Sequence, residues 1–275
     1  MNKGLEKIKY DFIEQVKHMD SVLGAWNFGS ETHNLSDDYS DVDIVLLIDG
    51  KQFDQFTFYL ESCLENISSK IILCWPERFN SEAIINNGYL LLSGSNIFQF
   101  DVFLLNAERL DDNMCRLHYT GLKKTDIIFD KTGIVNELME LRLTGSLWGD
   151  DVPYLEKTYW YHANMTGKYL KRKDYFKLNN VLHTMFETHI SMLLVGFDKI
   201  TWGGSANKLH FIPKGKQAHL KKYYCPENLE GVGQNLISCM RWFQEDTKEV
   251  YHLKGLDYSP YLGDTVINSW VKEMG

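Results

Sequence analysis

The sequence of 275 residues lacks the features that mark several classes of protein. Its five cysteines are an odd number without Cys-x-x-Cys spacing, which argues against a disulfide framework and against a zinc ribbon. The N-terminal segment has no apolar stretch typical of a signal peptide, and no run approaches the roughly 18 apolar residues of a membrane span. We therefore expect a soluble, cytoplasmic protein with reduced thiols and no membrane partner.

Basic side chains are scarce in the first part of the chain. Residues 1–150 hold 24 acidic and 13 basic side chains, whereas residues 151–275 hold 13 and 16. A protein that follows the phosphates of a nucleic acid needs clustered Lys and Arg, so the charge distribution argues against a nucleic-acid partner. An acidic first part suits metal cations or a cationic ligand instead.

Apolar periodicity predicts two domains of different class. Residues 3–19 and 52–66 have the spacing of amphipathic helices, and short apolar runs predict strands at 22–28, 42–48, 70–75, 89–92 and 97–105. From residue 154 the pattern changes to long helical segments at 154–172, 175–196, 228–253 and 262–273. We therefore predict an α+β fold, with a mixed-sheet domain over residues 1–150 and an all-helical bundle over residues 151–275.

The most specific motif is Phe28-Gly29-Ser30, followed after ten residues by Asp41-Val42-Asp43-Ile44. Side chains alternate across a strand, so Asp41 and Asp43 should project from one face while Val42 and Ile44 enter the core. Their Cβ atoms would then lie roughly 6–7 Å apart, close enough for both carboxylates to reach one or two divalent cations. Without an ion such a pair would repel, and one pKa would rise.

Two further features extend this motif. A glycine at a strand end lets a phosphate approach the backbone, and a following serine supplies a hydroxyl, so Gly29 and Ser30 are candidates for holding a triphosphate. Asp101 is flanked by apolar residues in a later predicted strand and offers a third carboxylate. Asp-x-Asp is also common as a solvated strand end, and Gly-Ser is often only a turn. The ordered combination favours the functional interpretation.

This pattern resembles the DNA polymerase β-type nucleotidyltransferase superfamily. Within it the chain looks most like the bacterial antibiotic adenylyltransferases, above all the streptomycin enzymes, through residues 100–105, 108–111, 128–131, 159–160 and 168–172. The chain departs from the streptomycin enzymes at Glu31, where they carry a basic residue, and in its shorter spacer. The ten-residue spacer before Ser40-Asp41 is more similar to lincosamide nucleotidyltransferases.

The resemblance implies a role for each motif residue. Gly29 and Ser30 would bind the triphosphate of ATP, Asp41 and Asp43 would bind Mg²⁺, and Asp101 would bind metal or act as general base, with Glu82 a more distant candidate for the base. These groups would favour in-line attack of a small-molecule hydroxyl on the α-phosphorus, with pyrophosphate leaving.

A basic helix face adds one nucleotide-binding candidate. Lys168, Lys171 and Arg172 fall at i, i+3 and i+4, so they would present three cations on one face. Such a face could bind the triphosphate across a cleft between the domains, and Lys168 is then the leading candidate of the three. Alternatively, the face could simply be solvated.

Three functions stay open at this stage. The first is transfer of AMP from ATP to a cationic antibiotic such as an aminoglycoside, or to a lincosamide. The second is AMPylation of a protein partner by an antitoxin of the same superfamily, although the long helical domain favours a built-in acceptor site. The third is a nucleotide-binding scaffold without catalysis, which the presence of all three carboxylates disfavours. A tRNA or poly(A) nucleotidyltransferase is disfavoured by the charge distribution.

Overall fold

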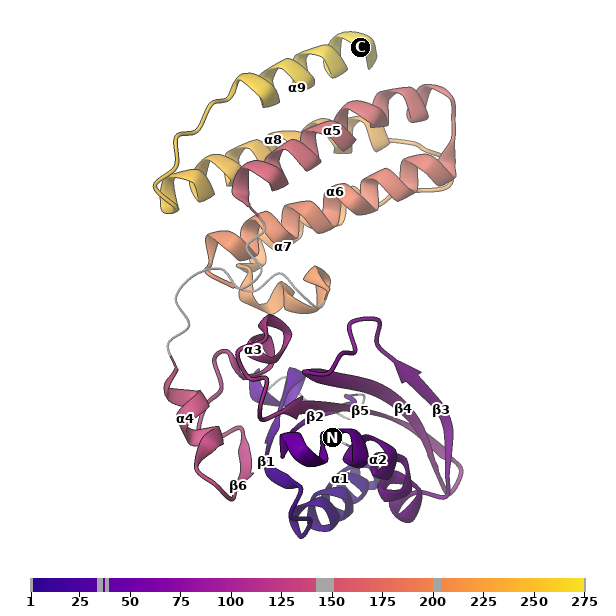
Figure 1. Ribbon diagram of the computed structural model, residues 1–275. Coiled ribbons are helices and arrows are strands. Elements are labelled where there is room, and N and C mark those ends of the chain that lie inside the picture. The colour runs from indigo at the N-terminus through magenta and orange to yellow at the C-terminus, as the bar shows by residue number, and fades with distance from the viewer. Residues whose placement is uncertain (1, 34–36, 38–39, 142–150, 200–203, 275) are drawn as a thin grey trace. The chain divides into compact units, whose positions relative to one another are not determined.

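A computed structural model describes residues 2–274 except 34–36, 38–39, 142–150 and 200–203 (Figure 1). The chain divides into two compact units, residues 1–144 and residues 145–275. The domain boundary expected between residues 150 and 151 falls at the end of a segment outside the described residues, and it stays a prediction. In the described residues the first unit combines helices with a mixed sheet and the second is helical, which confirms the predicted α+β fold class.

The first unit is built on a six-stranded sheet with the order β3-β4-β5-β2-β1-β6. Strands β2 and β5 are parallel, whereas the other neighbouring pairs are antiparallel. The strands are β1 (Val22–Asn27), β2 (Val42–Ile48), β3 (Lys70–Pro76), β4 (Ile84–Ser93), β5 (Asn96–Asn106) and β6 (Ile127–Asp130). Because β2 and β5 lie in the middle, the side chains of β2 and those of β5 from Val102 onward are mostly buried on both faces, and this explains the nearly continuous apolar sequences there.

Helices cover both faces of this sheet. The long helices α1 (Lys3–Lys17) and α2 (Phe53–Ile67) lie against one face (Figure 1). Their buried positions recur at helical spacing, as in Leu5, Ile8 and Phe12, and they pack on Val42, Ile44 and Phe100 of the sheet. The opposite face packs on the shorter helices α3 (Asn113–Tyr119) and α4 (Ile134–Glu140). Two short 3₁₀ helices, η1 (Gly29–His33) and η2 (Gly50–Gln52), follow β1 and β2.

The second unit consists of helices in its described residues. Its elements are α5 (Val152–Lys171), α6 (Tyr175–Gly196), η3 (Ser205–Phe211), α7 (Lys214–Leu220), η4 (Lys221–Tyr223), α8 (Val232–Leu253) and α9 (Tyr261–Met274). The four long helices match the four predicted segments closely. No helix in the described part of the chain has the length and apolarity needed to cross a membrane. All five cysteines of the chain are free thiols.

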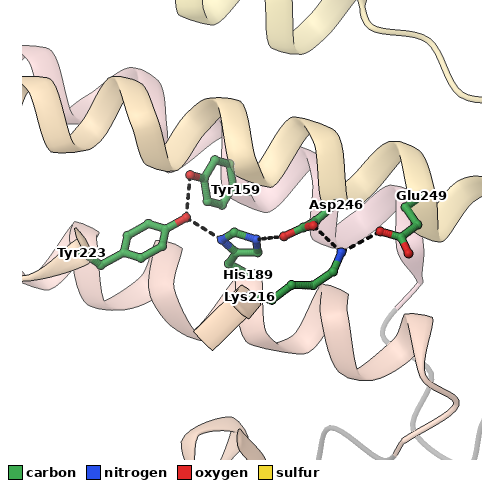
Figure 2. A network of polar contacts seen from close by, with 6 residues as sticks. All are labelled: Tyr159, His189, Lys216, Tyr223, Asp246 and Glu249. Atoms are coloured by element: carbon green, nitrogen blue, oxygen red, sulfur yellow. Dashed lines mark hydrogen bonds and ion pairs between the residues drawn. The ribbon is translucent and has the colours of Figure 1, made fainter. Parts of the chain in front are cut away.

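A buried polar network lies inside the helical unit (Figure 2). The Nε2 atom of His189 on α6 lies 2.9 Å from Oδ2 of Asp246 on α8, and its Nδ1 atom lies 2.9 Å from the Tyr223 hydroxyl. The Tyr159 hydroxyl is 2.7 Å from that of Tyr223. Because an ionised Asp246 can only accept, His189 donates from Nε2 and accepts at Nδ1. Each polar group of this network therefore has a partner, which is the condition for burying it without a large cost.

Lys216 on α7 completes the network from outside. Its Nζ atom lies 2.6 Å from Oδ1 of Asp246 and 2.6 Å from Oε2 of Glu249. Burial pushes the pKa of Asp246 upward, but hydrogen bonds from His189 and Lys216 hold it below its ordinary value. Burial also lowers the pKa of His189 against the opposing effect of Asp246. An ionised Asp246 beside a neutral His189 makes this unit less stable as the pH falls below the ordinary pKa of each group.

Replacing Asp246 tests the contribution of this network to stability. Asp246→Ala leaves the buried Nε2–H of His189 unpaired and removes one of the two carboxylates around Lys216. Leaving a buried donor without its partner typically costs about 1–3 kcal/mol. We expect that decrease in the free energy of unfolding, measured by urea denaturation together with amide hydrogen exchange in α6 and α8.

Glu249→Ala is the matched control, because Glu249 is the other carboxylate on Lys216 and its side chain is 54% exposed. An exposed ion pair contributes about 0–1 kcal/mol. Equal losses in the two variants would contradict the importance of the buried half of the network.

Candidate active site

Three carboxylates converge on one face of the sheet. One carboxylate oxygen from each of Asp41, Asp43 and Asp101 lies within 4.8 Å of the others. Asp41 directly precedes β2, Asp43 is the second residue of β2, and Asp101 lies in β5. The parallel register of these strands pairs Asp43 with Asp101. The alternation predicted from Asp-x-Asp is confirmed, because Val42 and Ile44 are fully buried on the opposite face, which α1 and α2 cover.

The carboxylates resist ionising together. Burial, followed by the nearby charges of Asp41, Asp101 and Glu31, raises the pKa of Asp43 to about 8, and Lys9 opposes this effect. Burial also raises the pKa of Asp101, while a hydrogen bond from Gln99 lowers it and the charges of Asp41 and Glu77 raise it. Only a proton or a cation can relieve this repulsion. Clustered carboxylate oxygens are the ligands that Mg²⁺ and Mn²⁺ prefer, so the residues fit a divalent metal.

Gly29 places the turn after β1 directly against Asp43. The Phe28 N–H donates to the backbone oxygen of Asp43 at 3.1 Å. Gly29 then adopts a φ of +64°, and a Cβ at this position would lie 2.1 Å from Oδ2 of Asp43. Only glycine avoids both the backbone strain and this clash. The glycine of the motif is thus explained by a backbone that passes within contact distance of the carboxylate.

Ser30 offers a free hydroxyl at the same place. Its Oγ atom is buried and has no hydrogen-bond partner in the described part of the chain. A buried hydroxyl without a partner is costly in a protein that needs it only for structure. Its position, next in the chain to the glycine that contacts Asp43, fits an oxygen-rich ligand held over the carboxylates.

Glu31 is paired rather than free. Lys9 on α1 forms an ion pair with Glu31 on η1, and both side chains are more than four-fifths buried. This contact ties the Gly29-Ser30 turn to the first helix. It also supplies a positive charge near Asp43, whose pKa Lys9 lowers. The chain therefore places a basic group near the turn from a distant segment, although the residue after Ser30 is acidic.

A second glycine leaves room for the side chain of Asp101. Gly88 on β4 pairs with Asp101 on β5, and a Cβ on Gly88 would lie 2.6 Å from Oδ1 of Asp101. On the other side, the Gln99 amide donates to Oδ2 of Asp101 at 2.9 Å. Sequence analysis did not find these neighbours. The Gln99-x-Asp101 spacing, which places both side chains on one face of a strand, was the available signal.

Five of the six predicted site residues come together in the first unit: Gly29, Ser30, Asp41, Asp43 and Asp101. The sixth, Lys168, is exposed on α5 of the second unit, with its Nζ atom 4.9 Å from the ring centroid of Tyr169. Its assignment to a nucleotide stays a prediction. Glu82, the second candidate for a general base, forms an ion pair of 3.8 Å with Arg109 and is not part of the carboxylate cluster.

Removing the charge of Asp43 should stabilise the metal-free protein. With its pKa raised to about 8, Asp43 binds a proton in the folded state that the unfolded chain releases near pH 4. Its contribution to stability therefore decreases as the pH rises through this window. Asn cannot ionise, so we expect Asp43→Asn to raise the Tm at pH 8 in EDTA, by about 2–4 °C per kcal/mol gained.

The exposed Asp54 on α2 provides the control for this change, and Asp54→Asn should leave the Tm unchanged. Differential scanning calorimetry of the three proteins gives the comparison. A lower Tm for Asp43→Asn than for the unsubstituted chain at pH 8 would contradict the electrostatic argument.

Gly29→Ala should disrupt the carboxylate cluster. The new methyl group would displace Asp43, so we expect the rise in Tm on adding Mg²⁺ or Mn²⁺ to be largely lost. Gly94→Ala is a matched control, because Gly94 has a φ of +61° with no atom within 4 Å of its would-be Cβ. Both variants carry the cost of a left-handed residue, about 1–2 kcal/mol. Equal responses to the metal would show that Gly29 does not position Asp43.

Comparison with known proteins assigns the family. The model of the streptomycin adenylyltransferase family matches residues 6–274. No curated protein gives a match. Among solved structures, an aminoglycoside 6-adenyltransferase from Bacillus subtilis aligns over 99% of both chains, with 11% sequence identity and a TM-score of 0.46. That likeness is too remote to carry an argument, so the assignment rests on the family match over nearly the whole chain. The chain belongs to the streptomycin adenylyltransferase family and is an enzyme that transfers nucleotides.

Proposed function

We propose that this protein transfers AMP from ATP to a hydroxyl group of a cationic, sugar-like antibiotic of the aminoglycoside class, with Mg²⁺ held by Asp41, Asp43 and Asp101. The observation that carries the proposal is the convergence of three carboxylates within 4.8 Å beside a turn that ends in a free serine hydroxyl. The family match supports adenylyl transfer, and its description names streptomycin. Because the proposed donor is ATP, which is available in the cytoplasm, we also propose that the enzyme is cytoplasmic.

The protein's own groups supply alignment and charge neutralisation. A bound Mg²⁺ would reduce the negative charge of the triphosphate and bring the acceptor hydroxyl into line with the α-phosphorus. Ser30 would donate its hydroxyl to the triphosphate, and Gly29 would let the phosphate approach the backbone. The acceptor oxygen forms a bond to the α-phosphorus while the bond to the bridging oxygen of the β-phosphate breaks, and pyrophosphate leaves. We propose that Lys168 of the helical domain also binds the triphosphate.

Asp101 is the proposed general base. Its carboxylate lies in the cluster, and an oxygen that the metal would leave free could take the proton that the acceptor hydroxyl loses. The hydrogen bond from Gln99 holds Oδ2 of Asp101, while Oδ1 lies toward Gly88. Asp43, in contrast, lies against the Gly29 turn on the triphosphate side.

The acidic charge of the first unit favours a cationic acceptor. Residues 1–150 have an excess of 11 acidic over basic side chains, which would attract guanidinium or ammonium groups of an aminocyclitol. We propose that the helical domain contributes to binding this acceptor.

An assay of the purified chain tests the proposal. ATP, Mg²⁺ and a panel of aminoglycosides and lincosamides should yield pyrophosphate and one product heavier by one AMP, detected by mass spectrometry. Asn substitution of Asp41, Asp43 or Asp101 should lower kcat/KM by about 100-fold or more, the scale of removing one preorganised electrostatic contact.

Asp54→Asn, an exposed carboxylate on α2, should retain full activity. Turnover of a lincosamide alone would reassign the acceptor, and AMP transfer only to a co-purifying protein would point to the AMPylating function. No turnover with any acceptor, or full activity in Asp43→Asn, would overturn the proposed chemistry.

A further inference from the structure

A row of residues crosses the sheet from the carboxylates to its edge. The strand registers pair Asp43 with Asp101, Asp101 with Gly88, and Gly88 with Trp75 on β3. Gly88 faces the same side as Asp101, because its would-be Cβ lies beside Oδ1 of that residue. Neighbouring strands are about 4.8 Å apart, so Trp75 stands roughly 10 Å from Asp101 along this row.

Trp75 lies on the carboxylate side of the sheet. Its neighbour Cys74 packs on the opposite side, against the core under α1 and α2, and pairs with the buried Tyr89. Alternation along β3 therefore turns Trp75 toward the face that carries Asp101. The indole is 61% exposed, and Leu73 on the same face is 44% exposed. A large exposed aromatic surface next to a catalytic cluster is a common mark of a ligand site.

An acidic side chain follows Trp75 at the end of the same strand. Glu77 is two residues further on, and its N–H donates to the backbone oxygen of Asn86 at 3.0 Å, which continues the pairing with β4. The negative charge of Glu77 contributes to raising the pKa of Asp101, so the two carboxylates lie close enough to interact. Trp75 thus stands on a surface that combines an aromatic face with negative charge, which is the combination that binds organic cations.

The two sides of the carboxylate cluster differ in what they can hold. Gly29 and Ser30 follow β1, on the far side of β2 from β4 and β3. If the triphosphate occupies that side, in-line attack requires the acceptor hydroxyl to approach from the opposite side. That side is the Gly88 and Trp75 side of Asp101.

We propose that Trp75 and Glu77 form the acceptor subsite and bind a cationic sugar ring, with the indole stacked on the ring and Glu77 paired with its ammonium or guanidinium group. Gly88 adds no side chain between Trp75 and Asp101, so a sugar bound at Trp75 would meet no Cβ at this position on its way to the general base. This inference rests on the proposed function, because it names the substrate surface of the same site.

Kinetics and direct binding together test the subsite. Trp75→Ala should raise KM for the aminoglycoside about 10-fold or more and leave KM for ATP unchanged, because only the acceptor contact is lost. Trp75→Phe should retain part of the affinity, since it keeps an aromatic face. Glu77→Gln should weaken binding of the cationic ligand more at low salt than at high salt.

Phe58→Ala is the matched control, because Phe58 is an aromatic residue on α2 with 84% exposure. It should change neither KM. Titration calorimetry with streptomycin and other aminoglycosides, without ATP, gives the affinity for each variant independently of turnover. A neutral disaccharide serves as the uncharged probe and should bind at least about 10-fold more weakly than the aminoglycosides.

The outcomes separate the subsite from the chemistry. Aminoglycoside binding that depends on Trp75, without AMP transfer, would support the subsite and overturn the proposed function. AMP transfer with the same acceptor KM in Trp75→Ala would leave the function intact and overturn the subsite. An increase in KM for ATP alone would assign Trp75 to the nucleotide instead and would also overturn the proposal. No aminoglycoside binding to the unsubstituted chain would overturn the subsite directly.

Discussion

The repulsion between Asp43 and Asp101 is the constraint on which the first unit depends. Parallel pairing of β2 and β5 places these carboxylates side by side on the two central strands, next to strand segments that are apolar and buried. The surrounding core is deep enough to hold them there, because Phe12, Phe100 and Val42 are fully buried below the site. The carboxylate cluster thus lowers the stability of the folded protein, and only a bound cation or proton relieves the repulsion between its charges.

The helical unit treats buried charge in the opposite way. Around His189 and Asp246 every charge has a partner, and the shifts in pKa keep one group neutral and the other ionised. Such a network holds α6, α7 and α8 together without leaving any demand for a ligand (Figure 2). The sheet unit differs in its carboxylate cluster, where like charges repel one another, and this repulsion supports our proposal that the chemistry takes place there.

Glycine organises the active site from both sides. Gly29 brings the backbone of the turn against Asp43, and Gly88 removes a side chain next to Asp101. In the proposed function the triphosphate lies on the Gly29 side of the carboxylates and the acceptor on the Gly88 side. Family membership establishes nucleotide transfer, and the positions of the two glycines support our proposal that donor and acceptor bind on different sides of the cluster.

The sequence alone determined the main elements and most of the carboxylate site, because helical and strand periodicity survive without tertiary context. The Asp-x-Asp alternation also fixed the direction of Asp41 and Asp43. Prediction from sequence missed the short elements α3, β6 and α4, of four to seven residues each, because their few apolar positions define no period. It also missed the Lys9–Glu31 pair and the row from Trp75 through Gly88 to Asp101. Strand order and register decide these contacts, since they join residues that no local pattern connects.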